Sequence, residues 1–227
     1  MREHHVVELT LNGRWRIDPI RCDEARHGES AWTSLDERKA AFDGKLTSIT
    51  MPSASQRAIH IVEVERSEQL LPAVANLPFP FNSYHKTIVV IGDDPTDLAE
   101  QARLHLQSIC AAVIEAAASH YDVAVVDRGR RGMISQLLGD RVSWRRVLLI
   151  GVACAATVAL PDAYRQETPA GKSELESSHT AFFLVPGTQR PDEAAWLAKV
   201  ASAFAGIDPS IALLIHGDDE AWQDVFA

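Results

Sequence analysis

The pattern of apolar and polar positions changes at about residue 86. Beyond it, short and almost wholly apolar runs alternate with longer segments whose apolar residues recur every three or four positions. Such runs are typical of strands buried on both faces of a parallel sheet, and the longer segments are typical of amphipathic helices. The predicted strands are 87–91, 122–127, 147–152, 180–185 and 211–216, and the predicted helices are 96–119, a segment from Met133, 192–204 and a terminal helix.

The first 65 residues follow a weaker pattern with partial period-two alternation. It predicts a β-hairpin, whose strands 6–11 and 14–17 flank the turn signal Asn12-Gly13, and a further strand over 58–64. We therefore expect an N-terminal β-rich extension over residues 1–65 and a second domain over residues 66–227. The predicted fold class is α/β, a Rossmann-like three-layer fold with a mostly parallel sheet, plus this extension.

Two short helices are also expected near the extension. Residues 20–55 are polar and uneven, and within them Ser34 can cap a helix that runs to Phe42. Ser67 can cap another helix towards Leu77, which Pro72 would interrupt.

One strand–turn–helix junction carries the strongest functional signal. The apolar run that ends at Asp127 continues into Arg128-Gly-Arg-Arg-Gly132, and a helical pattern begins at Met133. Right-handed crossovers place the carboxyl ends of parallel strands at one edge of the sheet. Open α/β folds bind phosphates there, on backbone N–H groups and a helix N-terminus. Glycines follow four of the predicted strands closely, at Gly92, Gly129, Gly187 and Gly217.

The distribution of charge narrows the class of ligand. The formal net charge of −9 argues against a nucleic-acid-binding protein. Between Asp127 and Arg146, however, six arginines and two aspartates give a local charge of +4. A basic patch on an acidic protein favours a small anionic ligand over a long polyanion.

Composition also indicates the compartment. The three cysteines, Cys22, Cys110 and Cys154, are far apart in the sequence and predict buried, reduced thiols. The N-terminus lacks the apolar core of a signal peptide, and the longest apolar stretch, 147–160, is shorter than the roughly 20 residues needed to span a bilayer. We expect a cytoplasmic protein with no membrane partner.

Several short motifs occur in the order found in a known family. They are Ile91-Gly92, Val126-Asp127-x-Gly129 with Gly132-Met133, Leu149-Ile-Gly-Val152, Leu175-Glu-x-x-His179 before Phe182-Phe-Leu-Val185, Asp192-Glu193, and His216-Gly217 with Ala221-Trp222. From about Gln69 onward the chain resembles the SLOG superfamily, which is related to the DprA and LOG proteins. It is most similar to the prokaryotic branch that resembles the cytosolic N-terminal region of TRPM channels.

The resemblance implies a Rossmannoid domain that binds a nucleotide or an ADP-ribose-like ligand and forms a homo-oligomer. With the Arg/Gly turn, it gives a set of candidate ligand-binding residues. They are Gly92, Asp93, Asp127, Arg128, Gly129, Arg130, Arg131, Gly132, His179, Glu193 and Gly217.

The sequence also departs from the family pattern. Asp93 stands in place of a second glycine, and the turn Asp-Gly-Gly-Thr has become Asp127-Arg-Gly-Arg-Arg-Gly132. Arg190-Pro191 replaces Trp-Gly, and Asp218 replaces a late glycine. Carboxylates next to a phosphate repel it, whereas arginines at a helix N-terminus attract it. The site is therefore either remodelled for a different ligand or degenerate.

Catalytic and metal chemistry have little support in the sequence. The LOG signature Pro-Gly-Gly-x-Gly-Thr-x-x-Glu is absent. His179 with Glu176 and His216 invite an acid–base interpretation, but single histidines are more often structural. No histidine spacing predicts a metal, and Asp93-Asp94 with Asp97 resembles a helix cap more than a cation site. We assign no catalytic residue, metal or cofactor.

Three functional hypotheses therefore stay open. The first is a non-catalytic sensor domain for a nucleotide or ADP-ribose-like ligand. The second is an enzyme that acts on a nucleotide-derived substrate, with Asp127, His179 and Glu193 as candidates. The third is an interaction subunit whose pocket has decayed. Binding without catalysis is the expectation carried forward.

Overall fold

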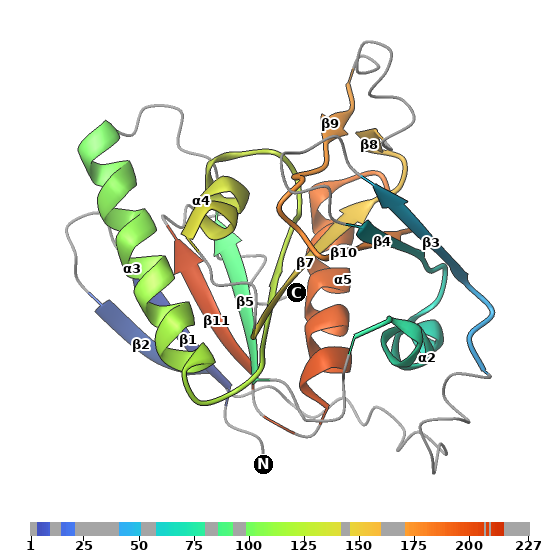
Figure 1. Cartoon of the computed structure of the whole chain (residues 1–227), viewed down its shortest axis with the longest axis horizontal. Coiled ribbons are helices and arrows are strands. Elements are labelled where there is room, and N and C mark those ends of the chain that lie inside the picture. The colour runs from blue at the N-terminus through green and yellow to red at the C-terminus, as the bar shows by residue number, and fades with distance from the viewer. Residues whose placement is uncertain are drawn as a thin grey trace.

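The computed structural model describes residues 4–9, 15–20, 41–50, 58–79, 86–92, 99–141, 146–159, 171–206, 208 and 210–215. A single large sheet crosses the molecule, with helices in front of it and behind it (Figure 1). Its strands, in spatial order, are β2 (Trp15–Ile20), β1 (His4–Leu9), β11 (Ser210–Ile215), β5 (Lys86–Gly92), β6 (Val123–Asp127), β7 (Val147–Cys154), β10 (Ala181–Val185), β4 (Ala58–Glu63) and β3 (Lys45–Thr50). From β1 to β4 in this order all neighbours pair in parallel, and the edge strands β2 and β3 pair antiparallel.

Helices α2 (Leu70–Asn76) and α5 (Arg190–Ala205) cover one face of the sheet. A 3₁₀ turn, η1 (Ser67–Gln69), leads into α2. Alternate strand residues such as Val126 and Val152 pack there against Val200 and Phe204 of α5. The period of two along a strand sends the intervening residues to the opposite face.

Helices α3 (Glu100–Ala118) and α4 (Met133–Arg141) cover that opposite face. Ile114 of α3 and Leu138 of α4 pack with Val125 and Leu149 of the strands. Towards β4, the same face carries a separate cluster around Phe182, above which lies a two-stranded sheet of β8 (Val158–Ala159) and β9 (Ser173–Glu174). The molecule therefore has three layers, as the α/β prediction requires.

The apolar runs predicted the central strands well. Each of the five strands expected after residue 86 is present, with ends shifted by one or two residues. The predicted strands of the N-terminal hairpin pair antiparallel. Helix α4 begins at Met133 as expected, and the ends of α3 and α5 lie within four residues of the expected ones. Burial on both faces forces nearly every position of these inner strands to be apolar, which explains the strength of the signal.

Local predictions near the extension were less accurate. Strand β3 lies in a stretch that we expected to be irregular. Pro72 does not interrupt α2, because it lies in the first turn, where its missing N–H is not needed. Gln69, and not Ser67, caps this region: its Oε1 accepts hydrogen bonds from the backbone N–H groups of Glu65 (2.7 Å) and Arg66 (3.1 Å).

Some predictions lie outside the described residues. These are the terminal helix and most of the helix from Ser34, whose last positions, Ala41 and Phe42, are described and are not helical. The strands from residues 1–65 join the same sheet as the rest, β1 beside β11 and β4 beside β10. The domain division after residue 65 stays a prediction. No helix in the part of the chain that the structure describes is long and apolar enough to cross a membrane.

The connections reverse direction beside β5. From β5 the chain moves through α3, β6, α4 and β7 to β10, always towards one edge of the sheet. It then returns through α5, on the other face, to β11 on the far side of β5. A reversal of this kind opens a crevice at the carboxyl ends of the two strands beside it, here β5 and β11. Such crevices bind ligands in open α/β folds.

Candidate functional site

A pocket of about 150 Å³ lies at the carboxyl ends of β5 and β6, next to this reversal. In Figure 1, α4 lies across the end of β5, and the first turn of this helix forms one wall of the pocket. Among the described residues the lining consists of Val90, Gly92, Asp127, Arg128, Arg130, Gly132, Ile134 and Ser135. The Arg/Gly turn predicted from the sequence therefore lies in a pocket at the expected edge.

Gly92, at the end of β5, allows both β11 and the first turn of α4 to lie close to its backbone. A Cβ atom at position 92 would collide with the carbonyl oxygen of Ile215 and would lie 2.7 Å from Cδ1 of Ile134. Because both neighbours are close, a larger residue here would push β5 away from β11 or fill the pocket.

Asp127 is the last residue of β6 and is only 2% exposed. Its Oδ1 accepts a hydrogen bond from the backbone N–H of Gly129 (2.8 Å), and its Oδ2 accepts one from Oγ of Ser135 (2.6 Å). Nε2 of His179 lies 2.6 Å from Oδ1. Burial alone raises the pKa of Asp127, but the charge and hydrogen bond of His179, with the bonds from Ser135 and Gly129, outweigh it, so the pKa lies below its ordinary value.

His179 precedes β10 and is brought to Asp127 by the fold, 52 residues along the chain. The ring is buried, and its centroid lies 5.2 Å from that of Phe182. Nδ1 is also buried and has no hydrogen-bond partner in the described part of the protein. Since one nitrogen contacts Asp127 and the other is enclosed, this histidine orients the carboxylate and does not itself line the pocket.

Gly129 turns the chain back over the sheet. Its φ of 61° lies in the left-handed region that favours glycine. A Cβ atom there would lie 2.6 Å from Cα of Gly151 and 2.6 Å from Cε1 of Phe182. The close approach that this glycine permits is therefore to β7 and to the ring of Phe182.

Arg130 lines the pocket and also reaches α5. Its Nη2 donates hydrogen bonds to Oε1 of Glu193 and to Oγ1 of Thr157 (2.8 Å). Glu193, which is 1% exposed, also accepts a hydrogen bond from the backbone N–H of Cys154 (2.9 Å). Nε of Arg130 is buried and has no partner among the described residues. One guanidinium thus connects the pocket with a buried carboxylate of α5.

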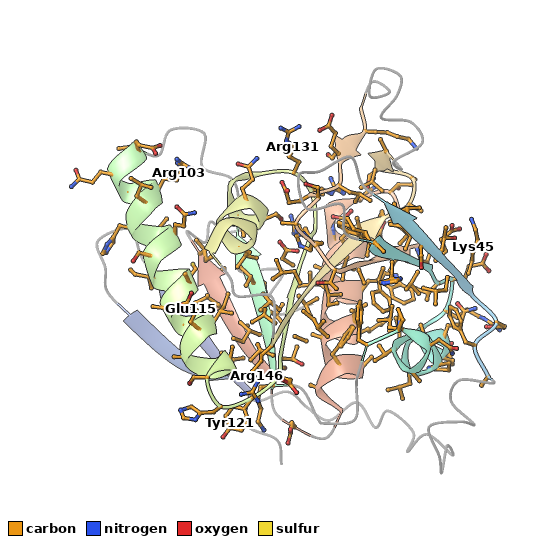
Figure 2. The ribbon with its side chains drawn as sticks, in the orientation of Figure 1. Lys45, Arg103, Glu115, Tyr121, Arg131 and Arg146 are labelled. Atoms are coloured by element: carbon orange, nitrogen blue, oxygen red, sulfur yellow. The ribbon has the colours of Figure 1, made fainter. Side chains whose placement is uncertain are left out.

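Arg131, the next residue, lies at the surface. Its side chain is 63% exposed, points outward in Figure 2 and pairs with Glu174 at 2.7 Å. Arg128 is partly buried in the pocket wall. The turn is further fixed to the segment before β10, because the backbone N–H of Arg131 donates to Glu174 and that of Glu176 donates to Gly129.

The predicted site residues fall into four groups. Gly92, Asp127, Arg128, Arg130 and Gly132 line the pocket, Gly129, His179 and Glu193 lie behind this lining, Arg131 is at the surface, and Asp93 and Gly217 lie outside the described residues. Ser135 and Thr157 were missed, although Ser135 lies in the first turn of the helix after Asp127, a position that the strand–turn–helix pattern could have indicated.

Two of the cysteines lie in the described part of the protein. Cys110 and Cys154 are buried and free, and burial raises their pKa values to about 12 and about 11, so neither is a nucleophile at neutral pH. Within the described ranges, no group of three or more histidine, cysteine or acidic side chains could hold a metal ion.

Fold and pocket together define an open, Rossmann-like α/β protein with a small polar pocket at the carboxyl edge of its sheet. The sequence model of a family described as "SLOG in TRPM, prokaryote" matches residues 85–227. This match covers more than half of the chain, and the chain belongs to that family.

Other comparisons add little. The Moco carrier protein from Chlamydomonas reinhardtii is 16% identical over 61% of this chain and 81% of its own, with a TM-score of 0.28. No curated protein matches the chain.

Proposed function

We propose that the protein is a non-catalytic sensor domain that binds a nucleotide or an ADP-ribose-like ligand in the pocket between β5, β6 and α4. The observation that carries the proposal is the coincidence of three features at one place. They are the pocket, the reversal of strand order, and the first turn of α4 with Arg128 and Arg130 beside it. Helix N-termini and arginines both favour a phosphate.

The size of the pocket supports a phosphate as the group that enters it. About 150 Å³ is less than the roughly 300 Å³ at which pockets for whole drug-sized ligands begin. A phosphate with its linking atoms occupies such a space, and the base and sugar would extend beyond the described lining.

The two alternative hypotheses have weaker support. An enzyme that used Asp127 and His179 as an acid–base pair would need the histidine to reach the substrate, yet His179 is buried behind the pocket lining and contacts Asp127. A decayed interaction subunit is favoured by the pairing of Arg130 and Arg131 with carboxylates, but it does not account for a pocket that stays open beside them.

Ligand binding is tested by a thermal-shift screen and calorimetry with adenine nucleotides, ADP-ribose and cyclic nucleotides. At least one of them should raise the melting temperature and bind with measurable heat. Replacing one of the two pocket arginines, Arg128→Gln, should weaken that binding by about tenfold or more, because a charge-assisted hydrogen bond contributes about 1.5–3 kcal/mol.

The matched control is Arg131→Gln, which removes an arginine from the same turn but outside the pocket. It should leave affinity nearly unchanged. The proposal is wrong if no nucleotide in the panel binds, or if the two variants affect binding equally.

A further inference from the structure

Arg130 and Glu193 form an ion pair that spans the carboxyl edge of the sheet. Arg130 lines the pocket on the side of α4, whereas Glu193 belongs to the first turn of α5 on the opposite face. Between them lies the end of β7, where Cys154 donates its backbone N–H to the same carboxylate. Glu193 therefore lies behind the pocket lining and contacts that lining at Arg130.

This pair removes the positive charge that Arg130 would otherwise bring to the pocket. The lining contains one carboxylate, Asp127, and two guanidinium groups, Arg128 and Arg130. Glu193, which contacts Arg130 directly, offsets the formal charge of that guanidinium. A buried anion with two charges needs a surplus of positive charge around it, because its loss of hydration is far larger than that of an anion with one charge.

We propose that Glu193 is a positioning residue that sets the charge selectivity of the pocket. With Arg130 neutralised, the pocket selects a phosphate that carries one negative charge over a terminal phosphate that carries two. Singly charged phosphates occur in phosphodiesters and in the two linked phosphates of a dinucleotide-like pyrophosphate. This inference rests on the proposed function and adds the ligand class.

Two adenine nucleotides with matching base and sugar test it by calorimetry on the full chain. At about pH 7.5, 3′,5′-cyclic AMP carries one phosphate charge and 5′-AMP carries close to two, since the second pKa of a phosphomonoester is about 6. The wild-type protein should bind the cyclic nucleotide more tightly. In Glu193→Gln, which keeps the shape of the side chain, the affinity for 5′-AMP relative to the cyclic nucleotide should rise by about tenfold.

Two variants control for structural effects. Glu174→Gln removes the carboxylate that pairs with Arg131, the neighbour of Arg130 in the Arg/Gly turn. It should leave the ratio of the two nucleotide affinities unchanged. The double variant Arg130→Gln/Glu193→Gln restores the formal charge of the wild type and should return the ratio towards the wild-type value. A merely structural role for Glu193 would not produce that return.

A second test uses the wild-type protein alone and so does not depend on whether a variant folds. Lowering the pH from about 7.5 to about 5.5 protonates the phosphomonoester, so 5′-AMP should bind more tightly relative to the cyclic nucleotide. Failure of both nucleotides to bind overturns the inference and counts against the proposed function. If both nucleotides bind and the wild type binds 5′-AMP at least as tightly as the cyclic nucleotide, the inference is wrong but the proposed function stands. The same holds if Glu193→Gln leaves the ratio of the two affinities unchanged.

Discussion

Three residues, Gly129, Gly151 and Phe182, join the Arg/Gly turn to the sheet. The ring of Phe182 packs against both glycines, and the two glycine Cα atoms are close enough that a Cβ on Gly151 would lie 2.8 Å from Cα of Gly129. Glycine-rich turns at strand ends are commonly interpreted as surfaces for a phosphate. Here the missing side chains also allow the turn to lie on β7.

The substitution Gly151→Ala should therefore destabilise the protein. Its Cβ would overlap the Phe182 ring and the backbone of Gly129, and overpacking of this kind costs about 3 kcal/mol. Urea denaturation measures the loss. Gly171→Ala is the control, because no atom of the described residues lies within 4 Å of the added Cβ and its φ of 81° opposes the substitution by about 1 kcal/mol. Equal losses in the two variants would contradict the packing argument.

Asp127 should make stability depend on pH in the acid range. Its folded pKa lies below the ordinary aspartate value of about 3.9, so the unfolded chain takes up the proton first as the pH falls. The ionised carboxylate therefore stabilises the folded protein fully at pH values above the ordinary aspartate pKa. This stabilisation is lost as the pH falls from there through the lower pKa of Asp127 in the folded protein. The difference in unfolding free energy between the wild type and Asp127→Asn, measured from about pH 6 to about pH 2.5, should shrink across that window. A difference that stays constant would show that the carboxylate is not responsible.

At the scale of elements, the Arg/Gly turn connects three parts of the fold. Backbone hydrogen bonds attach it to the segment that contains β9, and Arg130 and Leu175 form an isolated antiparallel bridge. His179 connects Asp127 to the start of β10, and Glu193 connects Arg130 to α5. Changes in the pocket can therefore reach α5, on the far face of the sheet, through one side chain.

The two adjacent arginines of this turn should differ greatly in their effect on stability. Arg130→Met leaves Glu193 buried without its cation and should cost about 3 kcal/mol. Arg131→Met removes an exposed ion pair with Glu174 and should cost less than about 0.5 kcal/mol. Chemical denaturation measures both, and Arg130→Met/Glu193→Met should recover part of the larger loss. Similar losses at the two positions would contradict the assigned partners.

The sequence predicted the elements better than the contacts between them. Inner strands such as β6 and β7 are buried on both faces, and this constraint is visible in any short window of sequence. The pairs Asp127–His179 and Arg130–Glu193 are 52 and 63 residues apart, and no local pattern encodes such contacts. The family resemblance identified Asp127, His179 and Glu193 as candidates, and the basic turn identified Arg130, but neither gave a sign that Glu193 pairs with Arg130.

On the scale of the whole molecule, the N-terminal strands are part of the main sheet. Ile59, Ile61 and Val62 of β4 are at most 3% exposed and pack against residues of β10 and its neighbours. Strand β1 pairs in parallel with β11 over five residue pairs. The family match begins at residue 85, so these strands complete a sheet whose central part carries the family's pattern.

A fragment of residues 66–227 should therefore fail to fold as a stable monomer. Removing β1 to β4 exposes the pairing edges of β10 and β11 and the apolar residues that β4 covers, and such edges promote aggregation. Circular dichroism during thermal unfolding, with size-exclusion chromatography, measures the outcome. A fragment of residues 41–227 lacks the N-terminal hairpin but keeps β3 and β4, so it should retain a cooperative transition at a lower temperature. If residues 66–227 instead unfold cooperatively at the same temperature as the full chain, they form an autonomous domain. The first 65 residues are then an extension that does not contribute to the stability of that domain.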